Sequence, residues 1–337
     1  MAMLRFRIGS PLLAAALAGS ICVPQPEGQW TRGWAVQWTP PQAASQGTPA
    51  ARSSQPFVGV TFIDREDTLP RAIHYRVVQV DLAADGIRVA LTAPSGTRES
   101  RRETTAAFLE RSRAQVAING HFFLPFPSDD ADAWLIGLAA SQGRVFSAFE
   151  TAEQSYALVA DAPAVNIDSR NRATIVHRDP SSSDGTRVRE NVELWTAVAG
   201  SAQILTDGRV TIPAYRDADH PTGLLTPGGP RNYSNANSWY DVVTARSAIG
   251  LSRDRRTLTL FAVDARGGSL GMKVGEVAAL LASEYGVADA LNLDGGGSTS
   301  LAMADPASGA AKLVNVSADN PAGRAVASSL AVFAKPR

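Results

Sequence analysis

The chain has 337 residues, of which 45% are hydrophobic, so it can bury a core for one large domain or two ordinary ones, and disorder of the whole chain is excluded. Its 32 basic residues balance its 32 acidic residues, so the formal net charge is zero. Because proteins bind nucleic acid largely by neutralising phosphates with basic side chains, this balance argues against a nucleic-acid partner.

The N-terminus resembles an export signal. Arg5 and Arg7 precede an apolar segment at 8–17, and Ala18 with Ser20 forms a small-x-small cleavage site. A membrane span needs ~20 apolar residues, and this segment is shorter, so we predict no membrane span. We predict a signal peptide at 1–20 and an exported protein, periplasmic or secreted. Removing both arginines leaves 30 basic and 32 acidic residues, a net charge of −2.

Residues 21–56 are rich in Pro, Gln, Ser, Thr and Ala, which is typical of a linker or N-terminal arm. Cys22 is the only cysteine, so no intrachain disulfide can form. A lipid anchor at Cys22 is an alternative to simple secretion, although Ile21 is bulky where such signals have a small residue. Trp30, Trp34 and Trp38 either pack as an arm on the domain or form a sugar-stacking patch.

We predict one catalytic domain at 57–337, of mixed α/β (α+β) class. Runs rich in β-branched residues predict strands at 57–63, 73–82, 87–93 and 115–120. The segment 100–113 is expected to be a helix, because Ser100 and Glu103 have the spacing of a capping box. The polar stretches 180–191 and 221–238 are expected to be long loops, which in compact domains are functional or mobile.

The C-terminal third is the most regular part of the sequence. A strand at 257–266, a helix at 273–286 ended by Gly286, and a strand at 287–294 suggest a crossover unit. Strands at 312–317 and 324–334 complete the sheet, whereas the N-terminal half has the pattern of antiparallel strands.

Polar residues stand at the ends of several predicted strands. Asn119 with Gly120, Asp264, and Asp294 each follow an apolar run, and Arg246 lies within the strand pattern "DVVTARSAIG". Singly, each has an ordinary explanation as a turn residue or a surface ion pair. Together they favour a site, because the carboxyl ends of parallel strands gather at one edge of a sheet. Asn292 is two residues before Asp294, so the two side chains are expected on the same face.

Several familiar sites are absent from the sequence. "DGGGSTS" has no Gly-Lys-[Ser/Thr], and Ser298 is not in a Gly-x-Ser-x-Gly elbow. The four histidines show no paired metal-ligand spacing. We therefore expect no required cofactor and no metal. Asp129, Asp130 and Asp132 could hold Ca²⁺, but without the spacing of an EF-hand, so a solvated loop is the better interpretation.

Five blocks in order, "AINGHFF", "ARSAIGLS", "TLTLFAVDAR", "VGEVAALLASEYGVADALNLDGGGSTSL" and "NPAGRAVASSLAVF", resemble the phosphodiester glycosidase domain, the family of the mannose 6-phosphate uncovering enzyme. The resemblance spans about Tyr75 to Phe333, and "NLDGGGST" is its most specific element. It implies a mixed α/β fold with a strongly curved sheet and peripheral helices. It also implies hydrolysis of a sugar-1-phosphodiester to a free sugar and a phosphomonoester.

The resemblance also implies which residues form the site. The expected catalytic residues are Asp294, Asp264 and Glu276, although an acid in the first turn of a helix such as Glu276 also favours the helix dipole. The expected substrate-binding residues are Asn119, Gly120, His121, Arg246, Arg266, Asn292, Gly295, Gly296, Gly297, Ser298, Thr299 and Arg324. Two positions depart from the family pattern: His121 stands where a small residue is common, and Gly323 stands where an acid is usual.

The chemistry of the implied reaction agrees with this residue set. The leaving phosphate monoester has a second pKa of about 6, so it departs with little acid assistance. An arginine such as Arg246 or Arg266 can bind phosphate bidentately. Asp294 or Asp264 can support the oxocarbenium-like centre or activate water. Glycines 295–297 lack a Cβ, so their N–H groups can approach substrate oxygens closely.

The substrate is expected to be a phosphate-linked glycan of the cell envelope or the extracellular space. Two other functions stay open on the sequence alone. One is a non-catalytic protein that binds phosphate-linked glycans with the same pocket. The other is a phosphodiesterase that breaks the P–O bond rather than the C–O bond.

Overall fold

The computed structural model describes residues 51–126, 128–149, 162–212 and 240–337, all within one compact unit, Gly47–Arg337. The predicted signal peptide at 1–20, Cys22, Trp30, Trp34, Trp38 and the predicted loop at 221–238 lie outside the described residues. Neither helix in the described part has the length and apolar composition that crossing a membrane requires.

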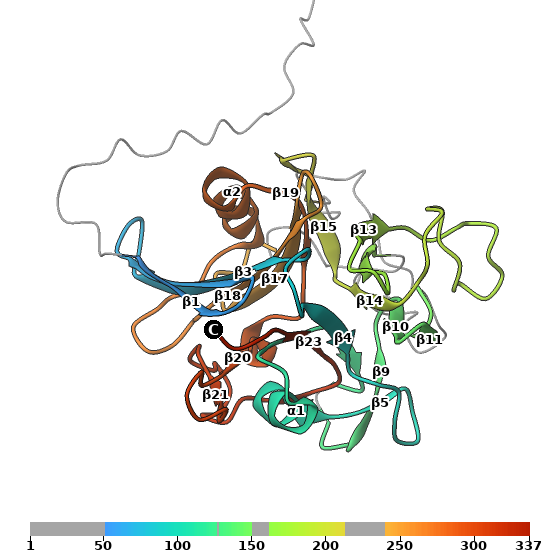
Figure 1. The fold of residues 1–337 in the computed structure, drawn as a ribbon, viewed down its shortest axis with the longest axis horizontal. Coiled ribbons are helices and arrows are strands. Elements are labelled where there is room, and N and C mark those ends of the chain that lie inside the picture. Colours follow the sequence, from blue (N-terminus) through green and yellow to red (C-terminus); the bar gives the residue numbers. More distant parts are fainter. Residues whose placement is uncertain (1–50, 127, 150–161, 213–239) are drawn as a thin grey trace, which may run out of the picture. The chain divides into compact units, whose positions relative to one another are not determined.

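The largest sheet has eight strands and mixes N-terminal with C-terminal segments (Figure 1). Every hydrogen-bonded neighbour pair in it is antiparallel. In spatial order the strands are β1 (Arg52–Phe57), β2 (Val60–Asp67), β3 (Ile73–Asp81), β18 (Thr257–Val263), β17 (Arg246–Ser252), β19 (Val287–Asn292), β15 (Ala202–Thr206) and β16 (Arg209–Val210).

Two five-stranded sheets complete most of the fold. The central one has the order β21 (Ala311–Leu313), β20 (Leu301–Ala304), β7 (Val116–Asn119), β23 (Ser329–Phe333) and β4 (Arg88–Leu91). The lateral one has the order β11 (Arg144–Ser147), β10 (Ala139–Ser141), β14 (Thr196–Ala199), β12 (Ala164–Ile167) and β13 (Ala173–Val176). Short pairings add β22 (Ala325–Val326) with β6 (Glu103–Thr104), and β5 (Ser100–Arg101) with β9 (Asp132–Leu135) and β8 (Phe123–Leu124).

The elements stack in layers, with α2 (Val274–Tyr285) on the outer face of the eight-stranded sheet and α1 (Thr105–Ser112) on the outer face of the central sheet (Figure 1). The main core lies between the two sheets, where Leu260 and Leu291 meet Ile118 and Leu330. A second core packs Val277 and Leu281 of α2 against the other face of the large sheet. The large sheet is therefore buried on both faces, which makes it a rigid support for the side chains at the ends of its strands.

The architecture corrects part of the expected fold. The protein is mostly β with two minor helices, and its strands form several open sheets rather than one strongly curved mixed sheet. Among the described residues, every pair of hydrogen-bonded strands is antiparallel, so the parallel pairing suggested by the crossover unit does not occur. However, β18 and β19 both pair with β17, so they run in the same direction with β17 between them. Their carboxyl ends therefore still meet at one edge.

The two predicted helices have different outcomes. The helix expected at 273–286 is confirmed as α2, ended by Gly286 with φ +65°. The helix expected at 100–113 starts later, at Thr105, and its cap is Thr104, whose hydroxyl accepts from the Ala107 N–H. Ser100 does not cap it but lies fully buried in β5. The capping-box spacing was misleading because pairing with β9 holds Ser100 in a strand.

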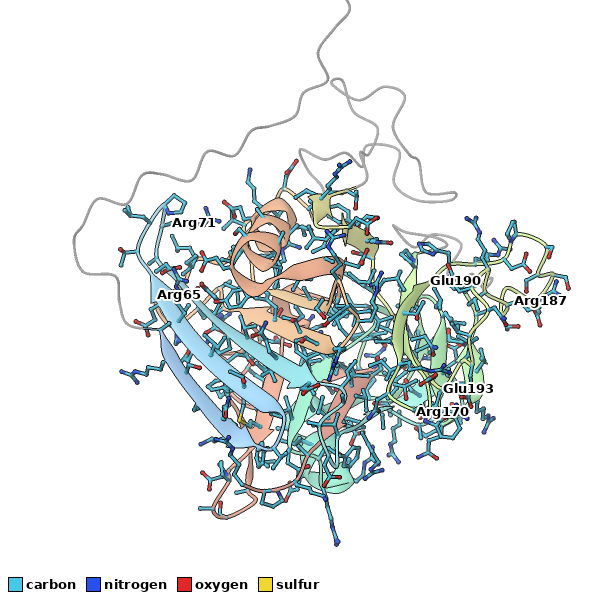
Figure 2. All side chains as sticks on the ribbon, turned by 45° about the horizontal axis from the view of Figure 1, so that its top comes forward. Arg65, Arg71, Arg170, Arg187, Glu190 and Glu193 are labelled. Carbon is cyan, nitrogen blue, oxygen red and sulfur yellow. The ribbon has the colours of Figure 1, made fainter. Side chains whose placement is uncertain are left out.

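The long loop expected at 180–191 is held by its own polar side chains. The Ser182 hydroxyl accepts from the N–H groups of Thr186 and Arg187 and donates to Asp184. Figure 2 shows Arg187 and Glu190 on the loops around the lateral sheet, and Arg65 and Arg71 beside the first strands of the large sheet. Charged side chains thus lie both around the lateral sheet and beside the first strands of the large sheet, and in the whole sequence the two signs balance.

Candidate active site

Three of the residues singled out in the sequence lie at one edge of the eight-stranded sheet. Asp264 follows β18 directly, and Asp294 comes shortly after β19. The strand between them, β17, runs the other way and starts with Arg246 at the same edge, opposite Val263 of β18. The strand register therefore brings together residues that are far apart in the sequence.

Asn119 brings the central sheet to this edge. Its side-chain N–H donates to the Asp294 carbonyl over 2.7 Å, and its side-chain oxygen accepts from the Ser247 hydroxyl (2.7 Å) and the Ser300 N–H (3.0 Å). The Gly120 carbonyl accepts from the Asp294 N–H. Asn119 is completely buried, so its contacts position the backbone on either side of the glycine loop.

The three glycines form a tight turn after Asp294. Gly296, Gly297 and Ser298 make one turn of 3-10 helix, and Gly296 has φ +57°, a conformation that residues with a Cβ rarely adopt. The Gly296 N–H donates to the Ala245 carbonyl over 2.8 Å, so it is not available for the substrate contact that we expected of it. A Cβ on Gly297 would overlap the guanidinium of Arg324. The loop thus needs one glycine for its turn and another for the approach of an arginine.

The Asp294 carboxylate has fewer partners in the protein than the Asp264 carboxylate at the same edge. Its residue is 8% exposed, and burial raises the pKa of its carboxyl to about 7. The Ser298 hydroxyl, the nearby positive charge of Arg324 and the Gly295 N–H all lower this pKa, but they do not cancel the effect of burial. Asp294 can therefore exchange a proton near neutral pH, which is the property of a general acid or base.

Arg324 stands beside Asp294 and is partly exposed, with 25% of its side-chain surface accessible. Its Nε donates to Asp319 over 2.9 Å, its Nη1 donates to the Ser298 hydroxyl over 3.3 Å, and its guanidinium lies 4.7 Å from the centre of the Phe126 ring. These contacts fix a positive charge next to the Asp294 carboxylate. A partly exposed, oriented guanidinium is well suited to bind phosphate.

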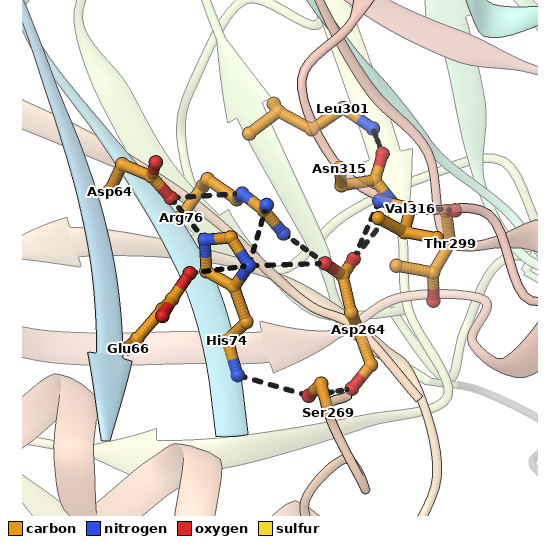
Figure 3. A network of polar contacts seen from close by, with 10 residues as sticks. All are labelled: Asp64, Glu66, His74, Arg76, Asp264, Ser269, Thr299, Leu301, Asn315 and Val316. Atoms are coloured by element: carbon orange, nitrogen blue, oxygen red, sulfur yellow. Dashed lines mark hydrogen bonds and ion pairs between the residues drawn. The ribbon is translucent and has the colours of Figure 1, made fainter. Parts of the chain in front are cut away.

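Asp264 is wholly buried and lies in a polar network (Figure 3). One carboxylate oxygen accepts from Arg76, and the other accepts from the Val316 N–H (2.9 Å) and the Asn315 side chain (3.3 Å). Burial raises the pKa of Asp264, although Arg76 and these hydrogen bonds oppose the rise. Both oxygens have protein partners, so Asp264 offers no exposed atom to a substrate.

The network extends in two directions from Asp264 (Figure 3). Outward, Arg76 and His74 both approach Asp64, with Arg76 Nε and His74 Nε2 at 3.1 and 2.6 Å from one carboxylate oxygen. Inward, the Asn315 side chain donates to the Thr299 carbonyl over 3.2 Å and accepts from Leu301. Asp264 is thereby connected to the end of the glycine loop.

The two other predicted arginines differ in exposure. Arg246 is 1% exposed, and its guanidinium donates to the backbone carbonyls of Met272 and Val242. Arg266 is exposed, and its guanidinium has no hydrogen bond or ion pair within the described ranges. Arg246 thus ties together the segments before β17 and α2, whereas Arg266 is free to contact a ligand.

The segment around Asp294 contains buried polar atoms without partners. Asn292 Oδ1, Thr299 Oγ1 and Ser300 Oγ have no hydrogen-bond partner among the described residues. The other end of the Asn292 amide donates to the Ser201 hydroxyl (2.8 Å), which also accepts from Tyr240 (3.1 Å). Buried polar groups are normally satisfied, so these three atoms are exceptions, and all of them lie within six residues of Asp294 in the sequence.

His121 and Glu276, both expected at the site, have other contacts. His121 is completely buried, and its ring nitrogens lie 2.8 Å from the Ser328 hydroxyl and 3.0 Å from the Leu138 carbonyl and the Ala199 N–H. Burial lowers its pKa to about 4, so the ring is neutral at pH 7. Glu276 accepts from the Lys273 N–H in the capping box of α2 and pairs with Arg71. These contacts suffice to explain both residues structurally.

In the described part of the chain, no group of three His, Cys, Asp or Glu side chains is arranged to hold a metal ion. Two of the three carboxylates that we considered for Ca²⁺ have protein partners: Asp130 pairs with Arg98, and Asp132 accepts from Thr97. These contacts give the 129–132 segment the character of a hydrogen-bonded loop.

Sequence reasoning missed several residues around the site. Arg76, Asn315, Asp319 and Ser201 hold the predicted residues in place. Arg76 carried a usable signal, because a charge inside the apolar strand "IHYRVVQV" needs a buried partner. The other three lie in irregular segments or at strand starts, where no pattern marks them.

A family model described as phosphodiester glycosidase matches residues 112–333. The chain belongs to this family of hydrolases. Its fold is similar to the catalytic domain of zebrafish N-acetylglucosamine-1-phosphodiester alpha-N-acetylglucosaminidase in a form auto-inhibited by its pro-peptide, with a TM-score of 0.57 and 18% identity over 85% of this chain and 88% of that one.

A hypothetical protein from Synechocystis is similar at a TM-score of 0.55 and 18% identity, covering 85% of this chain and 64% of that one. At such identities these structures show the shared fold alone. No curated protein sequence matches the chain. The family supports hydrolysis of sugar phosphodiesters as the general activity.

Proposed function

We propose that the protein is exported and hydrolyses a sugar-1-phosphodiester at the glycosidic C–O bond, on a phosphate-linked glycan of the cell envelope or the extracellular space. The observation that carries this proposal is Asp294, an almost buried carboxyl whose pKa is raised to about 7, beside Arg324. A group that titrates near neutrality next to a fixed positive charge supports acid–base chemistry on an anionic substrate.

In the proposed reaction, water attacks C1 of the sugar while the bond between C1 and the phosphate oxygen breaks. The electron pair of that bond leaves with the phosphomonoester, which needs little acid assistance because its second pKa is about 6. Asp294 takes a proton from the attacking water, and the Asp294 carboxyl becomes neutral. The products are a free sugar and a phosphomonoester, and the atoms balance without a cofactor.

Arg324 is the residue that we propose to bind the scissile phosphate. It is partly exposed, oriented by Asp319, and within hydrogen-bond reach of Ser298, which in turn contacts Asp294. Arg246, which the sequence favoured for this role, is buried against carbonyl groups, so we assign it to positioning β17 and the start of α2. Asp264 likewise acts through Asn315 on the glycine loop.

The unpartnered polar atoms of Asn292, Thr299 and Ser300 are buried around Asp294, so we assign them to the walls of the site and not to contacts with the sugar. The sugar is an open choice within the proposal. N-acetylglucosamine, named for the zebrafish relative, is the first to test.

The experiment is hydrolysis of N-acetylglucosamine 1-(methyl phosphate) and a panel of other sugar-1-phosphodiesters by wild type and by Asp294→Asn. We expect the substitution to lower kcat by about two orders of magnitude or more, because it removes the base while keeping the shape. Asp85→Asn is the matched control, since Asp85 is exposed and, within the part of the chain that the structure describes, pairs only with Lys335. A folded Asp294→Asn protein with near wild-type turnover contradicts the role of Asp294.

A second measurement separates C–O from P–O cleavage and an enzyme from a binding protein. In ¹⁸O-labelled water, C–O cleavage yields a phosphomonoester without label, which is the expected result. A labelled phosphomonoester would instead identify a P–O-cleaving phosphodiesterase. Tight binding of the whole panel with no product from any member would identify a non-catalytic glycan-binding protein.

A further inference from the structure

A groove of about 800 Å³ opens beside the proposed active site, outside the residues that perform the reaction. One wall is formed by α1, with Ala106 and Ala107, and the other by β21 and the segment after it, with Leu313, Val316 and Pro321. Figure 1 shows α1 and β21 side by side. Sites for small molecules commonly have volumes of about 300–1,000 Å³ and mostly apolar walls, so the groove has the size of a ligand site.

The groove adjoins Asp294 through a short chain of contacts. Asp319 lines the groove and accepts from Arg324 Nε, and Arg324 Nη1 donates to the Ser298 hydroxyl. Ser298 lies close enough to the Asp294 carboxyl to lower its pKa. One guanidinium and one hydroxyl therefore separate the groove wall from the proposed catalytic group.

The groove also reaches the polar network of Asp264. Asn315 lines it and donates to both Asp264 and the Thr299 carbonyl. A molecule in the groove would thus touch the residues that hold the glycine loop on one side and the arginine on the other.

The rim of the groove carries a cation that the protein does not neutralise. Arg266 lines it and is exposed, and no described residue forms a hydrogen bond or an ion pair with its guanidinium. The other cation on the rim, Lys312, lies 3.7 Å from Asp305. The groove is also lined by two acids, Asp319, which pairs with Arg324, and the exposed Glu110, so Arg266 is the cation there that is left to bind an anion.

We propose that this groove binds the aglycone of the substrate, and that this aglycone extends beyond the scissile phosphate and carries a second anionic group. The inference rests on the proposed function, since it takes Arg324 as the contact for the scissile phosphate. The apolar walls contact the chain that follows this phosphate, and Arg266 binds the second anion. The preferred substrate is then a phosphodiester within a longer anionic glycan or chain rather than a small ester.

The first test is binding of 1,4-butanediol bisphosphate, which represents the aglycone without any sugar, measured by isothermal titration calorimetry. We expect saturable binding by wild type, at least ten-fold weaker binding by Arg266→Ala, and partial recovery in Arg266→Lys. Ala107→Trp should abolish binding by filling the groove. The backbone N–H of residue 107, which forms the helix cap, is kept in that variant. Ser283→Trp, at an exposed position on α2, is the control for a bulky surface residue and should bind like wild type.

The second test compares two esters of N-acetylglucosamine 1-phosphate, the methyl ester and the 4-phosphobutyl ester. We expect wild type to show at least ten-fold higher kcat/KM on the 4-phosphobutyl ester, mostly through KM. Ala107→Trp should lose this preference while keeping its rate on the methyl ester, and Arg266→Ala should lose the preference as well. Hydrolysis of both esters with equal efficiency, or bisphosphate binding that no groove variant weakens, overturns the groove assignment alone. Hydrolysis of neither ester, nor of any sugar in the panel, overturns the proposed function and the aglycone role with it.

Discussion

Asp264 and Asp294 occupy equivalent places, each just past a strand of the same sheet, but their surroundings differ. Asp264 has no exposed surface, and its two oxygens accept from Arg76, Val316 and Asn315. For Asp294, the Ser298 hydroxyl, the charge of Arg324 and the Gly295 N–H lower the pKa of the carboxyl, but they do not offset its burial. One carboxylate is saturated by the protein, and the other is left incompletely satisfied.

This difference separates a carboxylate that supports the fold from one that can react. Burial raises the pKa of both, but only Asp264 has a directly paired arginine to oppose the rise. A buried carboxyl with a pKa near 7 and few hydrogen bonds lowers the stability of the folded protein. Proteins tolerate such a loss of stability at functional sites. The comparison predicts that replacing the first carboxylate damages the fold, whereas replacing the second damages the reaction.

The largest expected effect on stability belongs to Asp264→Asn. It leaves the buried Arg76 without its main partner, which should lower the free energy of unfolding by about 3 kcal/mol or more. Urea unfolding at pH 7 measures this. Asp64→Asn is the matched control, because Asp64 also contacts Arg76 but is partly exposed, and it should cost about 1 kcal/mol or less. Equal losses in the two variants would contradict the importance of the buried pair.

Asp294→Asn should have the opposite effect on stability, and the effect should grow as the pH rises from about 4 to about 7. The pKa of Asp294 is raised in the folded state, so its contribution is fully present below pH ~4 and is lost as the pH rises through about 7. Asn cannot ionise, so the variant should gain about 2–3 kcal/mol relative to wild type between pH 5 and pH 9. Unfolding curves at both pH values measure this gain. If the free energies of unfolding of the two proteins differ by the same amount at pH 5 and pH 9, the pKa of Asp294 is not raised by folding.

Gly297→Ala should disturb substrate binding through Arg324. The new Cβ overlaps the guanidinium, which must move away from Ser298. We expect KM for a sugar-1-phosphodiester to rise about ten-fold, or about 1.4 kcal/mol. The double variant with Arg324→Ala should be no worse than Arg324→Ala alone, because both changes remove the same contact. Additive effects would contradict a shared mechanism.

Gly296→Ala should have the smallest effect, and mainly on stability. No atom lies within 4 Å of the position its Cβ would take, so only the positive φ of +57° opposes it. The expected cost is about 1 kcal/mol in the free energy of unfolding, with KM close to wild type. A KM as high as that of Gly297→Ala would show that the turn itself, and not Arg324, controls binding.

The sequence predicted the strand ends correctly because apolar runs ending in Asp264 and Asp294 are local signals. Arg246 was expected within a strand and it starts β17, but its place between β18 and β19 follows from the strand order, which no local pattern gives. The partners were not accessible: Arg76 and Asn315 meet Asp264 from segments distant in the chain, and only the strand order brings them together. The sequence therefore could not tell the saturated carboxylate from the reactive one. It also could not tell the buried Arg246 from the partly exposed Arg324.

The capping error at Ser100 has the same origin. Its spacing to Glu103 satisfied a local rule, but pairing of β5 with β9 decided the conformation. Conversely, α2 followed its local signals because its N-terminal box and Gly286 agree with its packing on the large sheet.

Carboxyl titration of Asp294, followed by ¹³C NMR of aspartate-labelled protein, tests the central claim most directly. Comparison with Asp294→Asn identifies the signal. We predict a midpoint at about pH 7 for this carboxyl, and a limb at the same pH in kcat/KM below which activity falls about ten-fold per pH unit, because the base must be ionised. A midpoint near pH 4, or a kcat/KM profile without a limb near neutrality, would contradict the assignment of Asp294 as the catalytic base.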